Sequence, residues 1–498
     1  MESPNYSPTG RAFSTAAVLA GLLAATLHPA FATNWPVFGF DTARSGFNSD
    51  ERALTVGNVH RLHKRWQVSL GAVADSTPIL LEHVRIGRAE MPMLFQTRMD
   101  GVTLGIDATS GKIVWRFTTH GSTVTDSTPA ADPSGTSIYV PGIDGMVHKL
   151  SAATGREEHA PGFPARITLL PLTEKDASPL NVANGYLYAV TSGYNGDAPP
   201  YDGHVVAVDL NTGKTTIFNS LCSKYRKLVR AHTCTAQRSG IWGRGGVVVD
   251  PDSSMSGRIY AATGNGEFDA AHGGDNYGDT LLSLGADLSS LLGSYTPTDY
   301  KQLQEGDTDL GSSSPGILPD EATSQTPYMI VEGGKDAILK LLNRAALPGA
   351  GGELQLVDLP GGLFSAPAVW TDTSNNAWIF LGFSSEVTAY RLKTNKSGVS
   401  ELAGIWQASP GNSYGEGSSP VVADGIVFVA FDGAIVALNA VSGSELWSSA
   451  NRSAGGTIGG IHWQSPIVVN GSVYCSDENG KLTAYSLRND RLRVLDRG

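Results

Sequence analysis

The sequence Asp75-Ser76-Thr77-Pro78, followed further along by Asp107-Ala108-Thr109-Ser110-Gly111 and then Trp115, decides the fold. The same order returns as Ser418-Ser419-Pro420, then Asn439-Ala440-Val441-Ser442-Gly443 and Trp447. Each copy contains short apolar strands that are separated by Gly or Asp-Gly turns. A repeat of roughly 45–70 residues with about four short strands is typical of a β-propeller, because one such sheet cannot bury both faces alone.

Eight such units follow one another along the chain. The first strand of each begins near Pro78, Pro129, Pro179, Gly246, Pro315, Pro367, Pro420 and Pro466. The last unit, 465–487, has only three clear strands, whereas 62–70 has strand character and precedes the first full unit. We therefore predict an all-β, eight-bladed β-propeller of four-stranded antiparallel blades, with the ring closed by the N-terminal strand.

Tryptophans recur at one place in the repeat. Trp115 and Trp447 follow a Thr/Ser-Gly turn, and Trp66 and Trp406 end the same kind of strand. We expect these side chains to pack between neighbouring blades rather than to bind a ligand.

Charge and the N-terminus limit the partners and the compartment. The 498 residues carry a formal charge of −11 and no run of Lys or Arg, which argues against nucleic acid and anionic membranes as partners. Arg11 precedes an apolar run over 12–27, and Ala30-Phe31-Ala32 resembles a cleavage site. We predict a signal peptide over 1–32 and a single propeller domain over 33–498, periplasmic or secreted, without a membrane span after cleavage. The alternative is an N-terminal membrane anchor.

The three cysteines fit an exported protein. Cys222 and Cys234 flank a polar, basic loop and are expected to form a disulfide in an oxidising compartment. Cys475 lies in an apolar strand and is expected to be a buried thiol. The chain has no Cys-x-x-Cys-His sequence, so a c-type haem is not expected.

The units resemble the pyrroloquinoline quinone (PQQ) repeat, and residues 34–487 resemble the eight-bladed quinoprotein alcohol dehydrogenase superfamily. The segments 35–46 and 54–59 are similar to the opening segments of that family. The resemblance implies the propeller fold. It is less specific for activity, because non-catalytic propellers, including the outer-membrane assembly lipoprotein, share the repeat.

The resemblance implies three cofactor-binding residues. Ile241-Trp242-Gly243 is similar to the segment whose Trp forms the floor under the quinone, and a flat cofactor needs such an aromatic face. Lys335 matches the Lys or Arg that contacts the quinone carbonyls, where a cation stabilises developing negative charge. Trp463 stands at the start of the last blade, either near the cofactor or as a cover of the channel. Packing of Trp242 and solvation of Lys335 are the alternatives.

The resemblance also implies a metal site. Ala262-Thr263-Gly264-Asn265 is similar to the strand end whose Asn oxygen binds the metal, and a hard cation prefers oxygen ligands. Residues 305–311 resemble the acidic segment that supplies the base. Asp307 would take the substrate's hydroxyl proton beside the cation, and Asp309 would be an extra metal ligand. Ordinary turns are the alternative at both places.

Two departures from the family concern the chemistry. The adjacent cysteines that often cover the cofactor are missing. The metal-ligating Glu of the third unit is also missing, and only Asn195 or Asp197 stands near its place.

Acidic residues precede several unit starts, namely Asp75, Asp126, Asp176, Asp307, Asp309 and Glu416. If they converge on the channel mouth they would attract a cation, whereas the alternative is that they cap turns through backbone N–H groups.

Two functions therefore stand side by side. The first is a dehydrogenase that oxidises an alcohol or sugar with PQQ and Ca²⁺ or a lanthanide and passes electrons to a separate acceptor. The second is a non-catalytic propeller that serves as a protein-interaction platform. The first requires Trp242, Asn265, Asp307 and Lys335 to converge on one pocket the size of a tricyclic ligand. An enzyme of another class is a third option, but no Ser-His-Asp or zinc-type spacing favours it.

Overall fold

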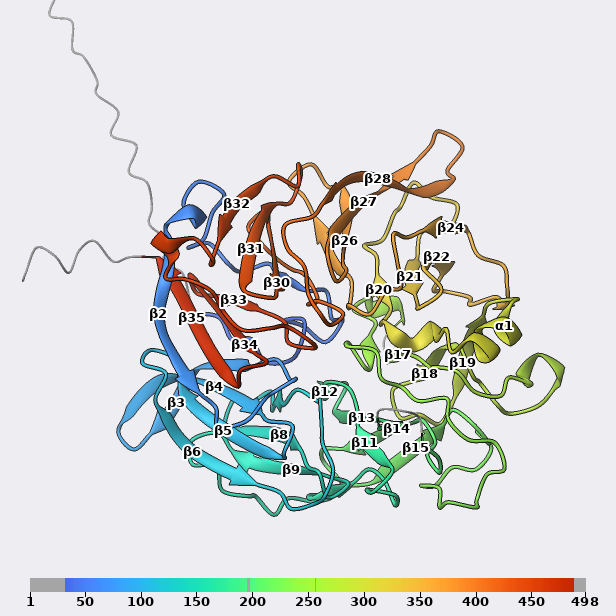
Figure 1. Ribbon diagram of the computed structural model, residues 1–498. Coiled ribbons are helices and arrows are strands. Elements are labelled where there is room, and N and C mark those ends of the chain that lie inside the picture. The colour runs from blue at the N-terminus through green and yellow to red at the C-terminus, as the bar shows by residue number, and fades with distance from the viewer. Residues whose placement is uncertain (1–31, 195–197, 256, 488–498) are drawn as a thin grey trace, which may run out of the picture. The chain divides into compact units, whose positions relative to one another are not determined.

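A computed structural model describes residues 32–194, 198–255 and 257–487. In this part of the chain the strands form eight small sheets arranged in a ring, which confirms the predicted eight-bladed propeller (Figure 1). The predicted signal peptide falls on residues 1–31, outside the described residues, and stays a prediction.

The blades follow one another in chain order, and each is a small sheet built mainly of strands that follow one another in the sequence. Blade 1 contains β3 (Ile79–Ile86), β4 (Ala89–Thr97), β5 (Val102–Asp107) and β6 (Ile113–Thr118), and blade 2 contains β7 (Ala130–Ala131), β8 (Ser137–Pro141), β9 (Met146–Ser151) and β10 (Ala165–Arg166). Blade 3 contains β11 (Glu174–Asp176), β12 (Asn181–Ala183), β13 (Tyr186–Gly193), β14 (His204–Asp209) and β15 (Thr215–Asn219). Blade 4 contains β16 (Val248–Val249), β17 (Arg258–Ala262), β18 (Leu281–Gly285), β19 (Leu291–Thr296) and β23 (Gly349–Ala350).

Blades 5 to 8 complete the ring. Blade 5 contains β20 (Gly316–Ile317), β21 (Met329–Gly333), β22 (Ile338–Asn343) and β24 (Gln355–Asp358), and blade 6 contains β25 (Ala368–Thr371), β26 (Ala377–Gly382), β27 (Val387–Thr394) and β28 (Ser400–Ala408). Blade 7 contains β29 (Val421–Ala423), β30 (Ile426–Phe431), β31 (Ala434–Asn439), β32 (Glu445–Ser448) and β1 (Phe47–Asn48). Blade 8 contains β33 (Ile467–Val469), β34 (Ser472–Asp477), β35 (Lys481–Leu487) and β2 (Leu62–Ser69).

Short helices lie only in the connections of the described chain. They are α1 (Tyr300–Gly306) and the 3₁₀ turns η1 (Val59–Arg61), η2 (Ser253–Met255), η3 (Ala270–His272), η4 (Leu310–Ser312) and η5 (Arg452–Ala454). Among the described residues, no helix has the length and apolar character that a membrane crossing requires.

The N-terminal strand closes the ring, as predicted. β2 pairs antiparallel with β35 from Leu62↔Leu487 to Ser69↔Lys481, and Figure 1 shows the blue strand beside the red one. The first and last parts of the propeller thereby share one sheet, so neither leaves an open strand edge at the junction.

Three blades depart from the predicted four strands. β11 adds a short strand to blade 3, while β23 and β1 add parallel strands to the edges of blades 4 and 7. These additions come from the long connections and the N-terminal segment, which run along sheet edges and pair with them. Repeat spacing predicts the consecutive strands but carries no signal for such pairings.

The tryptophans that recur beside the Thr/Ser-Gly turns pack between neighbouring blades, as predicted. The indole N–H of Trp66 in blade 8 donates to the carbonyl of Ala108 in blade 1 at 3.1 Å. Trp115 makes the same bond to Ala152 of the next blade at 3.0 Å. Gly111 has φ +74°, and a Cβ there would lie 2.7 Å from the Trp66 ring. The turn glycine therefore makes room for the tryptophan of the preceding blade.

Most of the hydrophobic core lies between neighbouring blades. One cluster joins blades 2 and 3 through residues such as Tyr139 and Leu187, and another joins blades 3 and 4 through residues such as Tyr188 and Ile259. Burial on both faces of each sheet fixes the ring, because every blade needs both neighbours to cover its apolar side chains.

The N-terminal segment covers one end of the innermost strands. The guanidinium of buried Arg44 donates to the carbonyls of Pro179, Leu180 and Gly245, at 3.1, 2.9 and 3.0 Å, and so links blades 3 and 4. Burial lowers the pKa of Arg44 to about 9, although Asp41 nearby opposes this shift. The gap that the structure describes beside Arg44 at this end holds only about 10 Å³.

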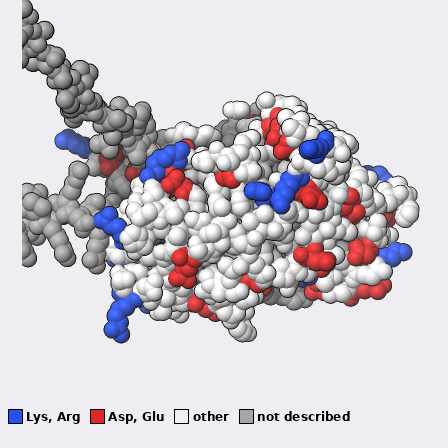
Figure 2. All heavy atoms as spheres, turned by 90° about the horizontal axis from the view of Figure 1, so that it is seen from above, with Lys and Arg blue, Asp and Glu red and all other residues white. Residues whose placement is uncertain are grey.

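Charged side chains are scattered singly over the face that Figure 2 shows. Lys and Arg alternate there with Asp and Glu and form no continuous basic field.

Candidate functional site

A cavity of about 680 Å³ lies where the loops leading into the innermost strands meet. Every residue that the sequence singled out for the site lines this one cavity: Trp242, Asn265, Asp307, Asp309, Lys335 and Trp463. They come from five separate connections, so the propeller brings together residues that are far apart in the sequence. The convergence that the dehydrogenase hypothesis requires is present.

The position of these residues follows from the repeat. Residues three or four positions before a unit start face the cavity, because each chain segment enters the first strand of its blade from the same end. The cavity residues at these positions are Asp126, Lys175, Trp242, Phe364, Glu416, His462 and Trp463. Sequence reasoning gave no site role to Lys175, Phe364 or His462, although this register could have found them.

Asn265 links the two aspartates of the acidic segment. Its backbone N–H donates to Asp309 Oδ1 at 2.6 Å, and its side-chain Nδ2 donates to Asp307 Oδ1 at 2.9 Å. Asp307 ends α1 in the left-handed conformation, with φ 53°, and this turn points its exposed carboxylate into the cavity. The amide oxygen of Asn265 is the atom of this residue that can accept a further ligand.

Lys335 supplies the positive charge on this wall. It forms an ion pair with the buried carboxylate of Asp309, and its Nζ lies 3.5 Å from Asp307 Oδ2. Burial alone would lower the pKa of Lys335, but the two carboxylates raise it above its ordinary value. Burial raises the pKa of Asp309, and Lys335 offsets this only in part. The ammonium group therefore stays charged at neutral pH.

Trp242 and Trp463 form one aromatic surface. Their ring centroids are 6.0 Å apart and their planes differ by 19°. A flat ring placed between the two indoles would need them to be roughly 7 Å apart, so no third ring fits between Trp242 and Trp463. The guanidinium of Arg244 lies 4.2 Å from the centroid of the Trp463 ring, and Nζ of Lys335 lies 5.2 Å from that of Trp242. A flat ligand would have to lie against this surface beside Lys335.

Further charged groups line the remaining wall. Lys175 forms an ion pair with Asp126. Arg238, which follows Cys234 closely in the sequence, also lines the cavity. Together with Lys335, these residues give the cavity three cationic side chains, which face the carboxylates of Asp126, Glu305, Asp307, Asp309 and Glu416 on the same lining.

Among the described residues of the third blade, none of those that line the cavity is the expected metal-ligating Glu. Ser192 and Tyr194 line this wall, while Asn195 and Asp197, the two suggested substitutes, lie outside the described residues. The donor set on the described residues is thus the Asn265 amide oxygen with the carboxylates of Asp307 and Asp309. These are all hard oxygen ligands of the kind that Ca²⁺ and lanthanides prefer, and Lys335 lies among them.

The acidic residues before the unit starts mostly bind side chains of the cavity wall. Asp75 accepts from His462 and Gln464, Asp126 pairs with Lys175, Glu416 lies by His462, and Asp309 pairs with Lys335. Asp176 differs, because it is fully buried and neither carboxylate oxygen has a hydrogen-bond partner. Burial raises its pKa well above the ordinary value.

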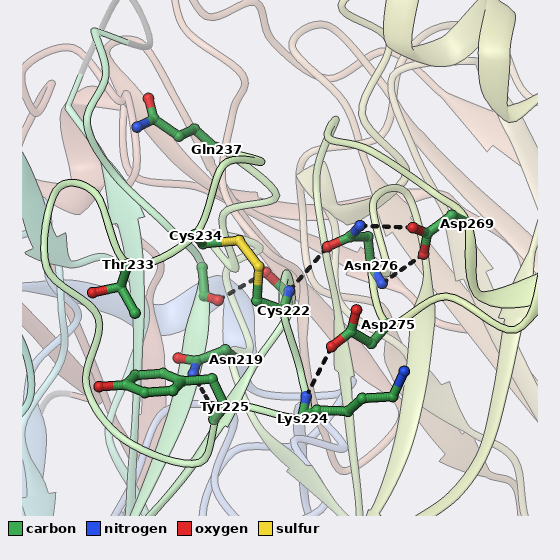
Figure 3. Close-up of a disulfide and its surroundings, with 12 residues drawn as sticks. Asn219, Cys222, Lys224, Tyr225, Thr233, Cys234, Gln237, Asp269, Asp275 and Asn276 are labelled. Carbon is green, nitrogen blue, oxygen red and sulfur yellow. Dashed lines mark hydrogen bonds between the residues drawn. A yellow bond between two sulfur atoms is a disulfide. The ribbon is translucent and has the colours of Figure 1, made fainter.

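The predicted disulfide closes a loop within the long connection between β15 and β16. Cys222 and Cys234 are bonded, with their Cα atoms 6.0 Å apart (Figure 3), and Cys475 is a buried free thiol, as predicted. The backbone N–H of Cys222 donates to Asn276 Oδ1 at 2.9 Å, and that of Lys224 donates to Asp275 Oδ2 at 3.2 Å. The disulfide loop and the 269–279 loop, which belong to the connections that carry Trp242 and Asn265, are thereby fixed to each other.

Comparisons with solved structures show the same fold at low sequence identity. The chain aligns with a quinohemoprotein alcohol dehydrogenase from Pseudomonas putida HK5 at a TM-score of 0.61 and 13% identity, covering 91% of this chain and 80% of that one. A europium-containing methanol dehydrogenase gives 0.61 and 14%, covering 91% and 98%. BamB from Moraxella catarrhalis gives 0.51 and 12%, covering 85% and 99%.

No curated protein sequence matches the chain. The model of a protein family does match, over residues 44–263 and 398–493, and these segments make up more than half of the chain. The chain therefore belongs to this family of PQQ-repeat propellers, whose description is outer membrane protein assembly factor BamB.

Proposed function

We propose that the protein is a quinoprotein dehydrogenase that oxidises an alcohol or a sugar. PQQ and Ca²⁺ or a lanthanide would be its cofactors, and a separate carrier would accept the electrons. One observation carries the proposal: Trp242, Asn265, Asp307 and Lys335, each suggested by a different motif, line the same cavity.

The cavity suits the quinone in shape and charge. PQQ is a flat tricarboxylate, and the cavity of about 680 Å³ is within the range of ligand pockets in general. The Trp242 ring offers the flat face, and Arg238 and Lys335 would contact the carboxylates, while the bound metal ion would offset the acidic side chains of the lining. When bound, the quinone would supply a two-electron acceptor for hydride removal from the alcohol carbon.

The oxygen ligands suit a hard cation. Asn265, Asp307 and Asp309 would hold it, with one carboxylate fewer than the family's set. Lys335 now balances the charge of the two aspartates, so we expect cation binding to move its ammonium group away from Asp309 and towards the quinone.

Asp307 has the better position of the two aspartates for proton transfer. Its side chain is 64% exposed and faces the cavity, whereas that of Asp309 is 4% exposed and is held by Lys335. Asn265 donates to Oδ1 of Asp307, so Oδ2, which lies 3.5 Å from Lys335 Nζ, is the oxygen that would accept the hydroxyl proton of a substrate. Asp307 is therefore the proposed base, and Asp309 orients Lys335 and Asn265.

The proposed location is the periplasm or the cell exterior. The signal-like sequence over 1–32 and the Cys222–Cys234 disulfide both support export, since disulfides persist in oxidising compartments.

A non-catalytic interaction platform is the second candidate. It is favoured by the description of the matching family and by exposed apolar side chains on the outer strands of blades 5 and 6, namely Leu354, Leu356, Val399 and Ile405. Gln355 and Leu402 bond these two outer strands to each other, so the side chains share one rim.

Reconstitution separates the two candidates. The mature protein would be mixed with PQQ and either Ca²⁺ or La³⁺, and reduction of an artificial electron acceptor would be followed with a panel of primary alcohols and aldoses. We expect turnover that needs both cofactors, with kcat at least about 100-fold lower in Asp307→Asn while PQQ still binds. If neither metal gives PQQ binding or turnover, the platform replaces the dehydrogenase as the proposed function.

A further inference from the structure

A second cluster of ligand-type side chains reaches the cavity wall through His462. Asp75 precedes β3 of blade 1, His462 precedes β33 of blade 8, and Glu478 lies in the turn between β34 and β35. One ligand atom from each of these three residues lies within 4.8 Å of the other two. Within the described residues no other group of three His, Cys, Asp or Glu side chains comes together in this way.

The spacing is close to that of a bound ion. Tetrahedral ligands about 2.0–2.2 Å from Zn²⁺ are roughly 3.3–3.6 Å from one another, so the side chains would close in by up to about 1 Å on binding. His462 Nδ1 already lies 3.2 Å from Asp75 Oδ2. Asp75 is buried, while Glu478 is exposed and His462 lies between these extremes.

A buried amide holds both carboxylates in place. Nε2 of Gln464 donates to Asp75 Oδ1 at 2.9 Å and to Glu478 Oε1 at 2.5 Å. The other oxygen of Asp75 faces His462, and Oε2 of Glu478 remains for a further partner. Hydrogen bonds that orient metal ligands in this way are a general feature of metal sites.

A fourth residue, Glu416, adds a carboxylate next to these three. Glu416 Oε2 is buried and accepts no hydrogen bond, although it lies 3.4 Å from Nε2 of His462. The cluster thus contains three carboxylates, and the nearest fixed cation is Arg244, whose guanidinium donates to the backbone carbonyls of Gly417 and His462. The carboxylates therefore receive no hydrogen bond from Arg244.

We propose that Asp75, His462 and Glu478 form a second metal site, for a divalent transition cation such as Zn²⁺. An imidazole with two carboxylates suits Zn²⁺, Mn²⁺ or Fe²⁺ and not the all-oxygen coordination of Ca²⁺ or a lanthanide. Because His462 lines the cavity, a cation with three protein ligands has an open coordination position that can face the cavity.

His148 provides a matched comparison within the chain. Its Nδ1 lies 2.6 Å from Glu157 and its Nε2 lies 3.2 Å from Asp144, so it also sits between two carboxylates. These carboxylates face opposite ring nitrogens and do not converge on one point. His148 should therefore not bind a metal, despite the same residue types.

The test is a calorimetric titration of the full chain, without PQQ, with ZnCl₂ and separately with MnCl₂. We expect one equivalent of cation to bind to wild type and to raise its Tm. Glu478→Gln, at an exposed position that the fold tolerates, should weaken binding at least 10-fold, and His462→Gln should abolish it. His148→Gln should bind as wild type does.

Two results would overturn the site: no uptake by wild type, or equal uptake by wild type and Glu478→Gln. A parallel titration with Tb³⁺ distinguishes the two sites, because Asp309→Asn should weaken only the binding of the lanthanide and His462→Gln only the binding of Zn²⁺. Failure of PQQ to bind would leave this proposal untouched, since the zinc titration contains no quinone.

Discussion

The ammonium nitrogen of Lys335 lies 5.2 Å from the centroid of the Trp242 ring. Lys335 comes from the β21–β22 turn of blade 5 and Trp242 from the loop before blade 4, so two blades set this distance. A cation beside an aromatic face is a suitable surface for a flat anion, and Asp309 and Asp307 fix the cation there.

Removing the charge of Lys335 should destabilise the protein. Lys335→Gln leaves the carboxylate of Asp309 buried without its ion pair, which we expect to cost about 1–3 kcal/mol in the free energy of unfolding. The loss should be larger at pH 8 than at pH 5, because protonation relieves the unpaired carboxylate. Chemical denaturation at both pH values measures it. Lys393→Gln, at an exposed position, is the control, and an equal effect of both variants would refute the role of the pair.

The turn glycines allow a direct test of packing between blades. Gly111→Ala puts a Cβ 2.7 Å from the Trp66 ring, whereas Gly135→Ala, at a similar φ of +70°, meets no atom within 4 Å. Both variants should lose about 1 kcal/mol through backbone strain, and Gly111→Ala should lose about 1–3 kcal/mol more through the clash. Equal unfolding free energies for the two variants would show that the tryptophan does not need this space.

Reduction of the disulfide should loosen the rim of the cavity. Opening the loop between Cys222 and Cys234, which spans a sequence separation of 12, should lower the free energy of unfolding by up to about 3 kcal/mol. Thermal unfolding with and without dithiothreitol measures the change. The double variant Cys222→Ser/Cys234→Ser should unfold at the same temperature as the reduced protein, and dithiothreitol should not change its Tm. A wild-type Tm that the reductant does not change would contradict the prediction.

Buried carboxyl groups of blade 3 should make stability depend on pH. Burial raises the pKa of Glu174 to about 7, above its ordinary value of 4.5, although hydrogen bonds from Thr168 and Asp202 oppose this. A raised carboxyl pKa means that the folded state holds the proton more tightly, so stability is present at pH 4–5 and falls as the pH rises through 7. In Glu174→Gln this decrease in the free energy of unfolding with pH, on the order of 2 kcal/mol, should be absent.

The measurement is the free energy of unfolding from pH 5 to pH 8 by chemical denaturation. The replacement amide can keep both hydrogen bonds, so Glu174→Gln should be more stable than wild type at pH 8. Glu90→Gln, at an exposed position, should follow the wild-type curve. Parallel curves for wild type and Glu174→Gln would show that Glu174 is ionised in the folded protein throughout.

The repeat made the fold predictable because its signals are local. Each proline marker and Thr/Ser-Gly turn reports a strand start or end nearby, and the three-stranded last unit required β2 to complete it. The parallel pairings of β1 and β23 were not predictable in this way, because they depend on where long connections lie against finished blades.

The site was predictable only through the family motifs. Trp242, Asn265, Asp307 and Lys335 each stand in an ordinary turn sequence, and only the closed ring brings them to one cavity. The partners of His462 could not be read from the sequence, because Asp75 is separated from it by 387 residues and meets it through ring closure.

Binding of PQQ at equilibrium tests the central claim most directly. Dialysis of the mature protein against PQQ with Ca²⁺ or La³⁺ would be followed by the absorbance of the bound quinone, for wild type, Trp242→Ala and Lys335→Gln. The account predicts one metal-dependent equivalent bound to wild type, with affinity at least about 10-fold weaker in each variant, which corresponds to about 1.4 kcal/mol. The absence of bound quinone with either metal, or equal binding to all three proteins, would contradict it.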